Sequence, residues 1–252
     1  MPATARLLAI ETSTDVLSLA VGEPSCRAAF TGPGSAQASA TMLPAVQSLL
    51  GQSGWPLDTL DAIVFARGPG AFTGLRTACA VAQGLAYGAR SARHPDGLPV
   101  LPVDTLMALA EAARAERAAA GQRPPRVIVA LLDARMDEVY VAVYRIGPTG
   151  PDRTPLQAPR LCAPADLAAW LRQVLPADVA DADVLLAGNV FGVYAEALAG
   201  LGGERLHALP TAEALLRLAP QLLASGGAVA AREALPLYVR DKVARTTAER
   251  EA

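Results

Sequence analysis

Lysine is nearly absent from this 252-residue chain, in which Lys242 is the single lysine among 22 basic residues. No lysine lies near a glycine-rich segment, which argues against a Walker-type phosphate loop and against Schiff-base chemistry. The formal net charge of −2 provides no global positive field for nucleic acid. No apolar run approaches the ~18 residues that span a bilayer. Residues 1–6 lack a signal-peptide pattern, so we expect a cytoplasmic protein without membrane contact.

Histidine and cysteine are also scarce, which limits metal and nucleophilic chemistry. The two histidines, His94 and His207, have no second histidine or cysteine at ligand spacing. The three cysteines, Cys26, Cys79 and Cys162, are scattered and resemble small buried hydrophobic residues of a reducing compartment. We therefore predict that the chain holds no metal.

A glycine-rich segment at 67–76, Arg-Gly-Pro-Gly-Ala-Phe-Thr-Gly-Leu-Arg, is the most distinctive stretch of the sequence. It follows an apolar run at 62–65 that predicts a buried strand, and it precedes an alanine-rich segment at 77–89 that predicts a helix. In such a turn the backbone can come close to a phosphate or to another chain. The glycines are not spaced as Gly-x-Gly-x-x-Gly, so they do not support dinucleotide binding. Thr73 is a candidate N-cap of the helix.

Two parts of the chain share a layout of strand, acidic polar turn and strand, at 7–21 and at 127–144. This repetition predicts two related halves, each opening with a hairpin. The segment at 121–125, Gly-Gln-Arg-Pro-Pro, breaks the pattern and is a candidate boundary. In the second half, we expect a helix to follow Gly188 and Asn189.

Four segments, in order along the chain, resemble the signature segments of one family. On these motifs the chain is identified as a member of the TsaB family, also called YeaZ. The segment at 68–76 is similar to the family's Gly-Pro-Gly-Ser-Phe-Thr-Gly-Leu-Arg. The four segments are 8–14 (Leu-Ala-Ile-Glu-Thr-Ser-Thr), 68–76, 133–140 (Asp-Ala-Arg-Met-Asp-Glu-Val-Tyr) and 236–240 (Pro-Leu-Tyr-Val-Arg).

The resemblance implies an α/β protein with the two-lobed actin/hexokinase/Hsp70-like (ASKHA) fold, in which each lobe is a mixed sheet with helices. We expect residues 1–104 to form the N-terminal lobe, with a helix at 211–225 packing back on it. Residues 105–210 would form a second, smaller lobe. We expect residues 241–252 to be a flexible tail.

The resemblance also implies a function. TsaB is a partner of the related subunit TsaD, which carries the metal and the chemistry, and of the ATPase TsaE. The assembly transfers a threonylcarbamoyl group from threonylcarbamoyl-AMP to N6 of the adenosine that follows the anticodon, position 37, in tRNAs reading codons that begin with A. TsaB is expected to be a scaffold and activator without activity of its own. It would meet tRNA through the complex, and ATP or ADP would bind, if at all, at an interface of the assembly.

An enzyme of this fold needs an acidic residue in its first turn to organise magnesium and phosphate. This chain has Glu11 where the family usually has aspartate, and the longer side chain would displace a metal-bound water. We predict hydrogen bonds that stabilise the turns instead, with Asp133 accepting from the backbone of Arg135 and Met136. The residues of this vestigial phosphate loop are Glu11, Thr12, Ser13 and Asp133.

The metal-bearing paralogue uses paired histidines on the helix before the glycine segment. The comparable stretch here, 38–44, reads Ala-Ser-Ala-Thr-Met-Leu-Pro and contains no histidine. Alanine and methyl-bearing side chains do not ligate iron or zinc. The sequence therefore predicts no catalytic residue and no metal ligand in this chain.

Two predicted helices, at 41–50 and 77–89, are expected to form the contact face for TsaD, and for a self-dimer when TsaD is absent. Gly84 lies in a helix interior, where glycine costs about 1 kcal/mol relative to alanine. Such a glycine is tolerated where another element approaches closely. The predicted motif and interface residues are Gly68, Pro69, Gly70, Phe72, Thr73, Gly74, Arg76, Ala80, Gly84, Leu43, Val46 and Leu50.

Two alternatives remain from the residues alone. An ASKHA-type phosphotransferase acting with ATP would need a first-turn aspartate, and the chain has only Glu11 there. A peptidase would need a Ser-His-Asp, Cys-His or metal constellation, which two isolated histidines do not supply.

Overall fold

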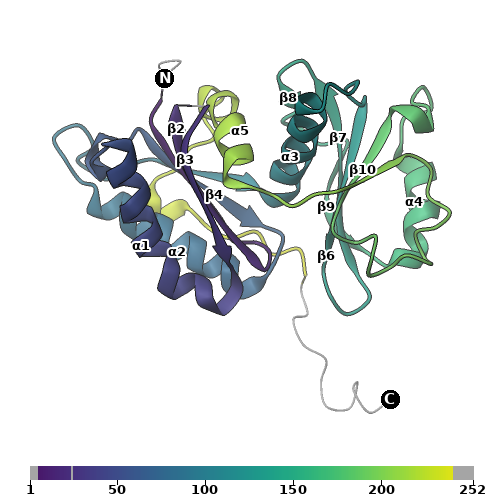
Figure 1. Ribbon diagram of the computed structural model, residues 1–252, viewed down its shortest axis with the longest axis horizontal. Helices are drawn as coiled ribbons and strands as arrows, with labels where there is room; N and C mark the ends of the chain where they lie inside the picture. The colour runs from purple at the N-terminus through teal and green to yellow at the C-terminus, as the bar shows by residue number, and fades with distance from the viewer. Residues whose placement is uncertain (1–4, 24, 241–252) are drawn as a thin grey trace, which may run out of the picture.

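The chain folds into two lobes, each built on one β-sheet, with two helices lying between the sheets (Figure 1). The computed structural model describes residues 5–23 and 25–240. The predicted tail at 241–252 lies outside the described residues.

The first lobe contains a five-stranded mixed sheet. Its strands lie in the order β3 (Ser25–Pro33), β2 (Val16–Glu23), β1 (Leu7–Glu11), β4 (Ala62–Gly68) and β5 (Val100–Asp104). Strand β1 is antiparallel to β2 and parallel to β4. A three-stranded meander is thus extended by two parallel strands that are reached through helices.

The second lobe repeats this arrangement. Its strands lie in the order β9 (Gln157–Cys162), β7 (Val139–Gly147), β6 (Val127–Asp133), β10 (Val184–Gly188) and β11 (Glu204–His207), and the short β8 (Gly150–Pro151) also pairs with β7. Strand β6 is antiparallel to β7 and parallel to β10. The shared order confirms the internal repeat that the two hairpin-like segments predict.

The helices lie in three layers around the sheets (Figure 1). The outer face of the first sheet is covered by α1 (Ser35–Ser53) and α2 (Phe72–Gly88). Between the sheets lie α3 (Thr105–Ala119) and α5 (Ala212–Ala224), while α4 (Leu167–Val174) covers the outer face of the second sheet. Short 3-10 helices occupy Leu57–Thr59, Pro164–Asp166, Asp181–Asp183 and Ala231–Glu233. None of the helices in the described part of the chain is long and apolar enough to cross a membrane.

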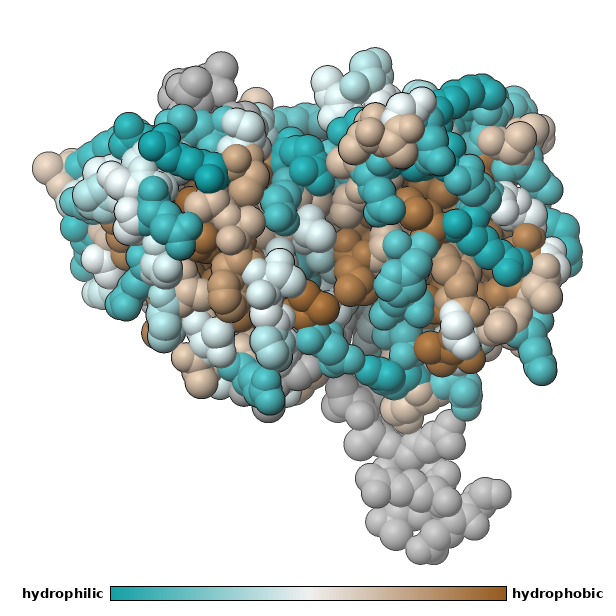
Figure 2. All heavy atoms as spheres, viewed as in Figure 1, coloured by the Kyte–Doolittle hydropathy of each residue, from teal (hydrophilic) through white to brown (hydrophobic). Residues whose placement is uncertain are grey.

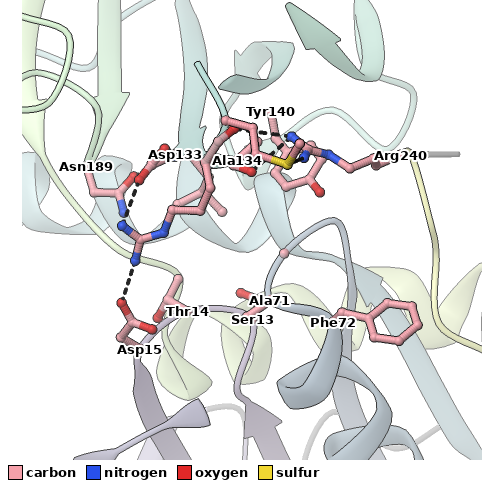
Figure 3. A pocket seen from close by; sticks show the side chains of 14 residues that line it. Ser13, Thr14, Asp15, Ala71, Phe72, Asp133, Ala134, Tyr140, Asn189 and Arg240 are labelled. Atoms are coloured by element: carbon pink, nitrogen blue, oxygen red, sulfur yellow. Dashed lines mark hydrogen bonds and ion pairs between the residues drawn. The ribbon is translucent and has the colours of Figure 1, made fainter. Parts of the chain in front are cut away.

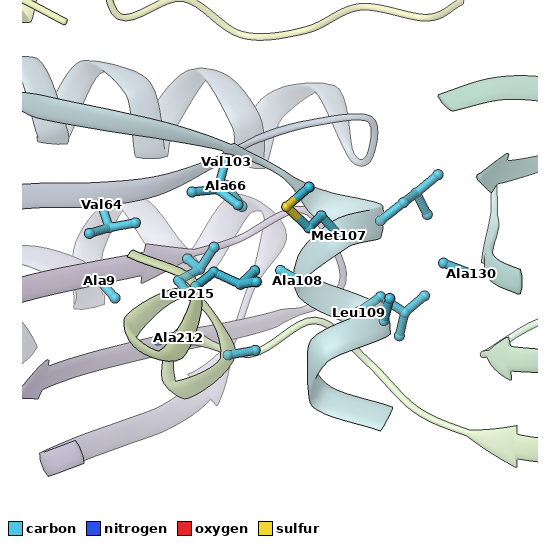
Figure 4. Close-up of a cluster of buried hydrophobic side chains, with 14 of the residues drawn as sticks. Ala9, Val64, Ala66, Val103, Met107, Ala108, Leu109, Ala130, Ala212 and Leu215 are labelled. Carbon is cyan, nitrogen blue, oxygen red and sulfur yellow. The ribbon is translucent and has the colours of Figure 1, made fainter. Parts of the chain in front are cut away.

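Both faces of the central strands are buried, and their side chains alternate between two cores. In β1, Leu8 and Ile10 belong to the core beneath α1 and α2, whereas Leu7 and Ala9 face α3 and α5. This follows from the period of two in a strand. The core between the sheets contains many alanines and is continuous across both lobes (Figure 4). Small side chains let the two sheets approach the helices between them.

Helix α3 is buried on most of its surface because it packs against both sheets and against α5. The buried carboxylate of Glu111 accepts hydrogen bonds from Arg114 Nε at 2.7 Å and from Arg217 Nε at 2.9 Å, which links α3 to α5. The predicted lobe limit between residues 104 and 105 therefore falls at the start of a helix that contacts both lobes. Helix α5 lies against β1 and β2.

Several predicted elements differ from the structure. The helix predicted at 41–50 is longer, since α1 begins at Ser35 and ends beyond Gly51. The helix expected after Gly188 and Asn189 is wrong, because residues 191–200 form a series of turns.

Candidate functional site

The glycine segment packs against the first turn of its own chain. A Cβ at Gly74 would lie 2.0 Å from the carbonyl oxygen of Thr12, and one at Gly70 would lie 2.5 Å from that of Ser13. Thr12 Oγ1 donates to the carbonyl of Gly74 at 2.8 Å, and the N–H of Ala71 donates to the carbonyl of Ser13 at 2.7 Å. These two glycines are therefore explained by close approach within the chain, without a phosphate or a partner.

Gly68 is required by its backbone and by a second contact. Its φ of +122° is accessible mainly to glycine, and a Cβ there would lie 2.5 Å from the carbonyl oxygen of Leu237. The N–H of Leu237 donates to the carbonyl of Arg67 at 2.7 Å, so the C-terminal segment is attached at this point. The predicted N-cap at Thr73 is wrong, because α2 begins at Phe72 with Ala71 at the cap position.

Glu11 ends β1 with its side chain fully buried. The N–H of Ser13 donates to Glu11 Oε1 at 2.5 Å, and Ser13 Oγ also donates to Oε1. Burial raises the pKa of Glu11 to about 7, although both hydrogen bonds from Ser13 act to lower it. Glu11 Oε2 has no hydrogen-bond partner in the part of the chain that the structure describes. This carboxylate belongs to the interior, and it stabilises the turn through the bonds with Ser13.

A cavity of about 260 Å³ lies between the lobes, in front of this turn (Figure 3). Arg135 lines the cavity and joins the two lobes there, since its Nη2 lies 2.9 Å from Asp15 Oδ2 of the other lobe. The cavity is lined by Ser13, Thr14, Asp15, Gly70, Ala71, Phe72, Leu132, Asp133, Ala134, Arg135, Met136, Tyr140, Asn189 and Arg240. Glu11 does not line it, and ligand pockets usually exceed about 300 Å³. In this conformation the cavity is therefore smaller than most ligand pockets.

Asp133 ends β6 on the second-lobe side of the cavity. Asp133 Oδ1 accepts from the N–H of Arg135 at 2.8 Å and from Tyr194 Oη at 3.0 Å. Burial and the bond to Asp133 raise the pKa of Tyr194 to about 12. The N–H of Asp133 donates to Asn189 Oδ1 at 2.9 Å. The predicted bond from Arg135 is confirmed, whereas the one expected from Met136 is replaced by the bond from Tyr194.

The turn after Asp133 has an unusual backbone. Arg135, Met136 and Asp137 have φ values of 60°, 57° and 57°. Left-handed residues other than glycine are uncommon. Each costs of order 1–3 kcal/mol and persists only where the surrounding structure imposes it. The side chain of Arg240 lies on this turn and donates from Nη2 to the carbonyl of Ala134 at 3.0 Å.

The predicted interface residues divide into an exposed and a buried set. Helices α1 and α2 contact each other on the outside of the first lobe. Val46 is only 1% exposed and belongs to the core, so it does not reach the surface. Around Gly84 a Cβ would meet nothing within 4 Å, so no element within residues 5–23 and 25–240 explains that glycine. The exposed members are Leu43, Phe72, Thr73, Arg76, Ala80 and Gly84, the half-buried ones are Gly70 and Leu50, and the buried ones are Gly68, Pro69, Gly74 and Val46.

The surface is a mixture of hydrophobic and hydrophilic areas, and hydrophobic side chains also come to the surface between the lobes (Figure 2).

The two histidines lie in different lobes. His94 lies in a loop of the first lobe, while His207 ends β11 in the second lobe. Among residues 5–23 and 25–240, no group of three or more His, Cys, Asp or Glu side chains is placed to hold a metal.

The sequence analysis assigned no role to the side chains of three residues at the cavity and its edge. Arg135 and Arg240 lie within two of the motifs, and each makes contacts to segments that are distant in the sequence. Tyr238 contacts Phe72, with ring centroids 5.1 Å apart. The sequence indicated a role for these three residues only through their positions within the family motifs at 133–140 and 236–240.

Two lobes whose sheets share one strand order, with helices between them and a cavity at their junction, define the actin/hexokinase/Hsp70-like class of α/β proteins. Within that class, the family model described as "TsaD: tRNA N6-adenosine threonylcarbamoyltransferase" matches residues 34–247. The Escherichia coli protein described as "tRNA threonylcarbamoyladenosine biosynthesis protein TsaB" is 33% identical over 250 residues, which cover 95% of this chain and 96% of that protein. The chain belongs to the TsaB (YeaZ) family.

Solved structures agree with this assignment. The structure of YeaZ from Pseudomonas aeruginosa has a TM-score of 0.77 and 33% identity, and the match covers 93% of this chain and 99% of that one. A second structure, titled "Crystal structure of an uncharacterized protein with similarity to peptidase YEAZ from Pseudomonas aeruginosa", has a TM-score of 0.78 and 36% identity, covering 94% and 100%.

Proposed function

We propose that this chain is a non-catalytic subunit in the biosynthesis of threonylcarbamoyladenosine in tRNA. The names of the relatives and of the matching family support this pathway. In the proposed complex, TsaD carries the metal and transfers the threonylcarbamoyl group to N6 of adenosine 37, and TsaE contributes ATPase activity. This chain binds TsaD, supports its active form and meets tRNA through the complex.

The burial of Glu11 is the observation that carries the non-catalytic assignment. An acid that organises magnesium and phosphate must face the cleft, whereas this carboxylate is enclosed and bonded to Ser13. The group that spans the cleft is instead the guanidinium of Arg135, paired with Asp15. We therefore expect ATP or ADP to bind at an interface of the assembled complex rather than to this chain alone.

The experiment that tests the assignment is a reconstituted transfer assay with tRNA and threonylcarbamoyl-AMP. We expect no transfer by this chain alone, no ATP-dependent phosphotransferase activity, and transfer once TsaD and TsaE from the same organism are added. Transfer or phosphotransfer by this chain alone would contradict the proposal.

The exposed faces of α1 and α2 form the proposed contact surface for TsaD, and for a second copy of this chain when TsaD is absent. This surface includes Leu43, Ala80 and Gly84 and excludes the buried Val46. Small residues on a helix surface allow the backbone of a partner to approach. Gly84, around which a Cβ would meet none of the described residues within 4 Å, fits this arrangement.

Replacing Ala80 with leucine is expected to weaken TsaD binding by at least about tenfold, because a larger side chain separates closely packed helices. The measurement is the dissociation constant for TsaD, obtained by titration. Ala169→Leu is the matched control, since Ala169 is an exposed alanine of α4 in the other lobe. Unchanged binding of the Ala80 variant would remove α2 from the proposed interface.

A further inference from the structure

The C-terminal segment at 234–240 runs from the first lobe to the second. It begins against α2, where the carbonyl of Ala234 accepts hydrogen bonds from Gln83 Nε2 at 2.9 Å and Cys79 Sγ at 3.1 Å. Its middle is held by the bond from the N–H of Leu237 to Arg67. The segment thus has a fixed path along the first lobe before it reaches the second.

Tyr238 attaches the segment to the start of α2 through a cluster of three exposed side chains. Arg76 lies 3.7 Å from the ring centroid of Phe72 and donates from Nε to Tyr238 Oη at 3.0 Å. Arginine over an aromatic ring is an attractive arrangement. Phe72 and Tyr238 nevertheless remain 37% and 45% exposed. This cluster is both an anchor for the segment and a surface that a partner can touch.

Two residues further on, Arg240 ends on the second lobe. Its Nη2 donates to Glu138 Oε2 at 2.5 Å, to the carbonyl of Ala134 at 3.0 Å and to that of Arg135 at 3.3 Å. The Arg240 side chain is only 10% exposed. One guanidinium therefore connects both ends of the left-handed turn, whose Arg135 side chain reaches across to Asp15.

We propose that residues 234–240 act as a strap that couples the exposed start of α2 to the turn at the cavity. The left-handed backbone at 135–137 is maintained because surrounding groups impose it, and Arg240 is one of those groups. The position of Arg240 in turn depends on Tyr238, because only one residue separates them.

The coupling has a functional consequence. A displacement of the cluster formed by Phe72, Arg76 and Tyr238 changes the position of Arg240, and with it the turn and its link to Asp15. Contact on the outside of the first lobe is thus communicated to the cleft between the lobes.

The test is hydrogen exchange of the full-length chain, read at the amides of Ala134, Arg135 and Glu138. These three N–H groups are hydrogen-bonded in the turn. Their exchange is expressed relative to amides of β1, so that a general loss of stability cancels. We expect Arg240→Gln to accelerate the relative exchange of these three amides by about tenfold. The substitution removes the guanidinium that bonds to Glu138 and to the carbonyl of Ala134.

Tyr238→Ala is the decisive variant, because Tyr238 belongs to the C-terminal segment and contacts Phe72 and Arg76 at the start of α2. We expect this variant to accelerate exchange of the same amides by about threefold or more. Tyr87→Ala is the matched control. Tyr87 is also an exposed aromatic residue of α2 with an arginine, Arg90, 4.1 Å from its ring centroid.

The strap is supported when the Tyr238 variant accelerates turn exchange and the Tyr87 variant does not. It is overturned when Tyr238→Ala leaves the turn at the wild-type rate, whatever the Arg240 variant does, since Arg240 would then act only locally. Equal acceleration by the Tyr87 variant would also overturn it. If the Arg240→Gln protein does not fold, Glu138→Gln is used in its place. Glu138→Gln removes the carboxylate to which Arg240 donates.

Discussion

Replacing Gly74 with alanine is expected to lower the free energy of unfolding by about 3 kcal/mol, the upper end of the usual penalty for overpacking. The added Cβ would lie 2.0 Å from the carbonyl oxygen of Thr12. That atom is backbone, so it cannot move aside without shifting the first turn. The hydrogen bond from Thr12 Oγ1 to the carbonyl of Gly74 would be disturbed as well. Urea unfolding at one fixed protomer concentration measures the change.

Gly84→Ala is the matched control on the same helix and should have the opposite sign. A Cβ at Gly84 meets nothing within 4 Å, so alanine should stabilise the monomer by about 1 kcal/mol through helix propensity. If both variants were equally stable, the close packing of α2 on the first turn would not exist in solution. The pair thus separates a glycine needed by the fold from one that the fold of this chain does not need.

Glu11→Gln is expected to remove a pH dependence of stability worth about 3 kcal/mol, at 1.36 kcal/mol per pKa unit. The folded-state pKa of about 7 lies above the ordinary value of 4.5 because of burial. Between these values the unfolded chain loses a proton that the folded chain keeps. This group's contribution to stability is therefore fully present below about pH 4.5, and it is lost as pH rises through 7. Glutamine cannot ionise, so the variant keeps the contribution at pH 8.

The measurement is the difference in unfolding free energy between Glu11→Gln and the wild type, determined from pH 4.5 to pH 8. We expect this difference to shift in favour of the variant by about 3 kcal/mol over the range. Glu116→Gln is the control, because it removes one carboxylate from an exposed position of α3. A difference that stays constant with pH for Glu11→Gln would show that the carboxylate is ionised in the folded state.

The two-sheet architecture could be predicted because its strands are encoded by apolar runs and a repeated hairpin pattern in the sequence. The apolar runs at 7–10 and 62–65 are continuous, which is typical of strands buried on both faces. The repeated hairpin at 127–144 marked the second sheet. The series of turns after Asn189 was missed because local patterning there resembles a helix start.

The role of the glycines could not be predicted, because it depends on contacts across many residues. Gly74 approaches Thr12, which lies 62 positions earlier. Gly68 approaches Leu237, which is far along the chain. A glycine-rich turn between a strand and a helix looks the same in sequence whether it receives a phosphate, a partner or a segment of its own chain. Only the packing of these segments distinguishes the three.

The sequence by itself determined the strand periodicity, the repeated halves and the four family motifs, because each depends on neighbours within a few residues. Only the tertiary structure decided that Glu11 is enclosed, that Arg135 spans the cleft, and that Arg240 connects the C-terminal segment to the second lobe. The physical reason is that these features depend on the packing of distant segments. Arg135 and Asp15 are 120 positions apart, Arg240 and Glu138 are 102 positions apart, and the burial of Glu11 depends on the elements packed around β1.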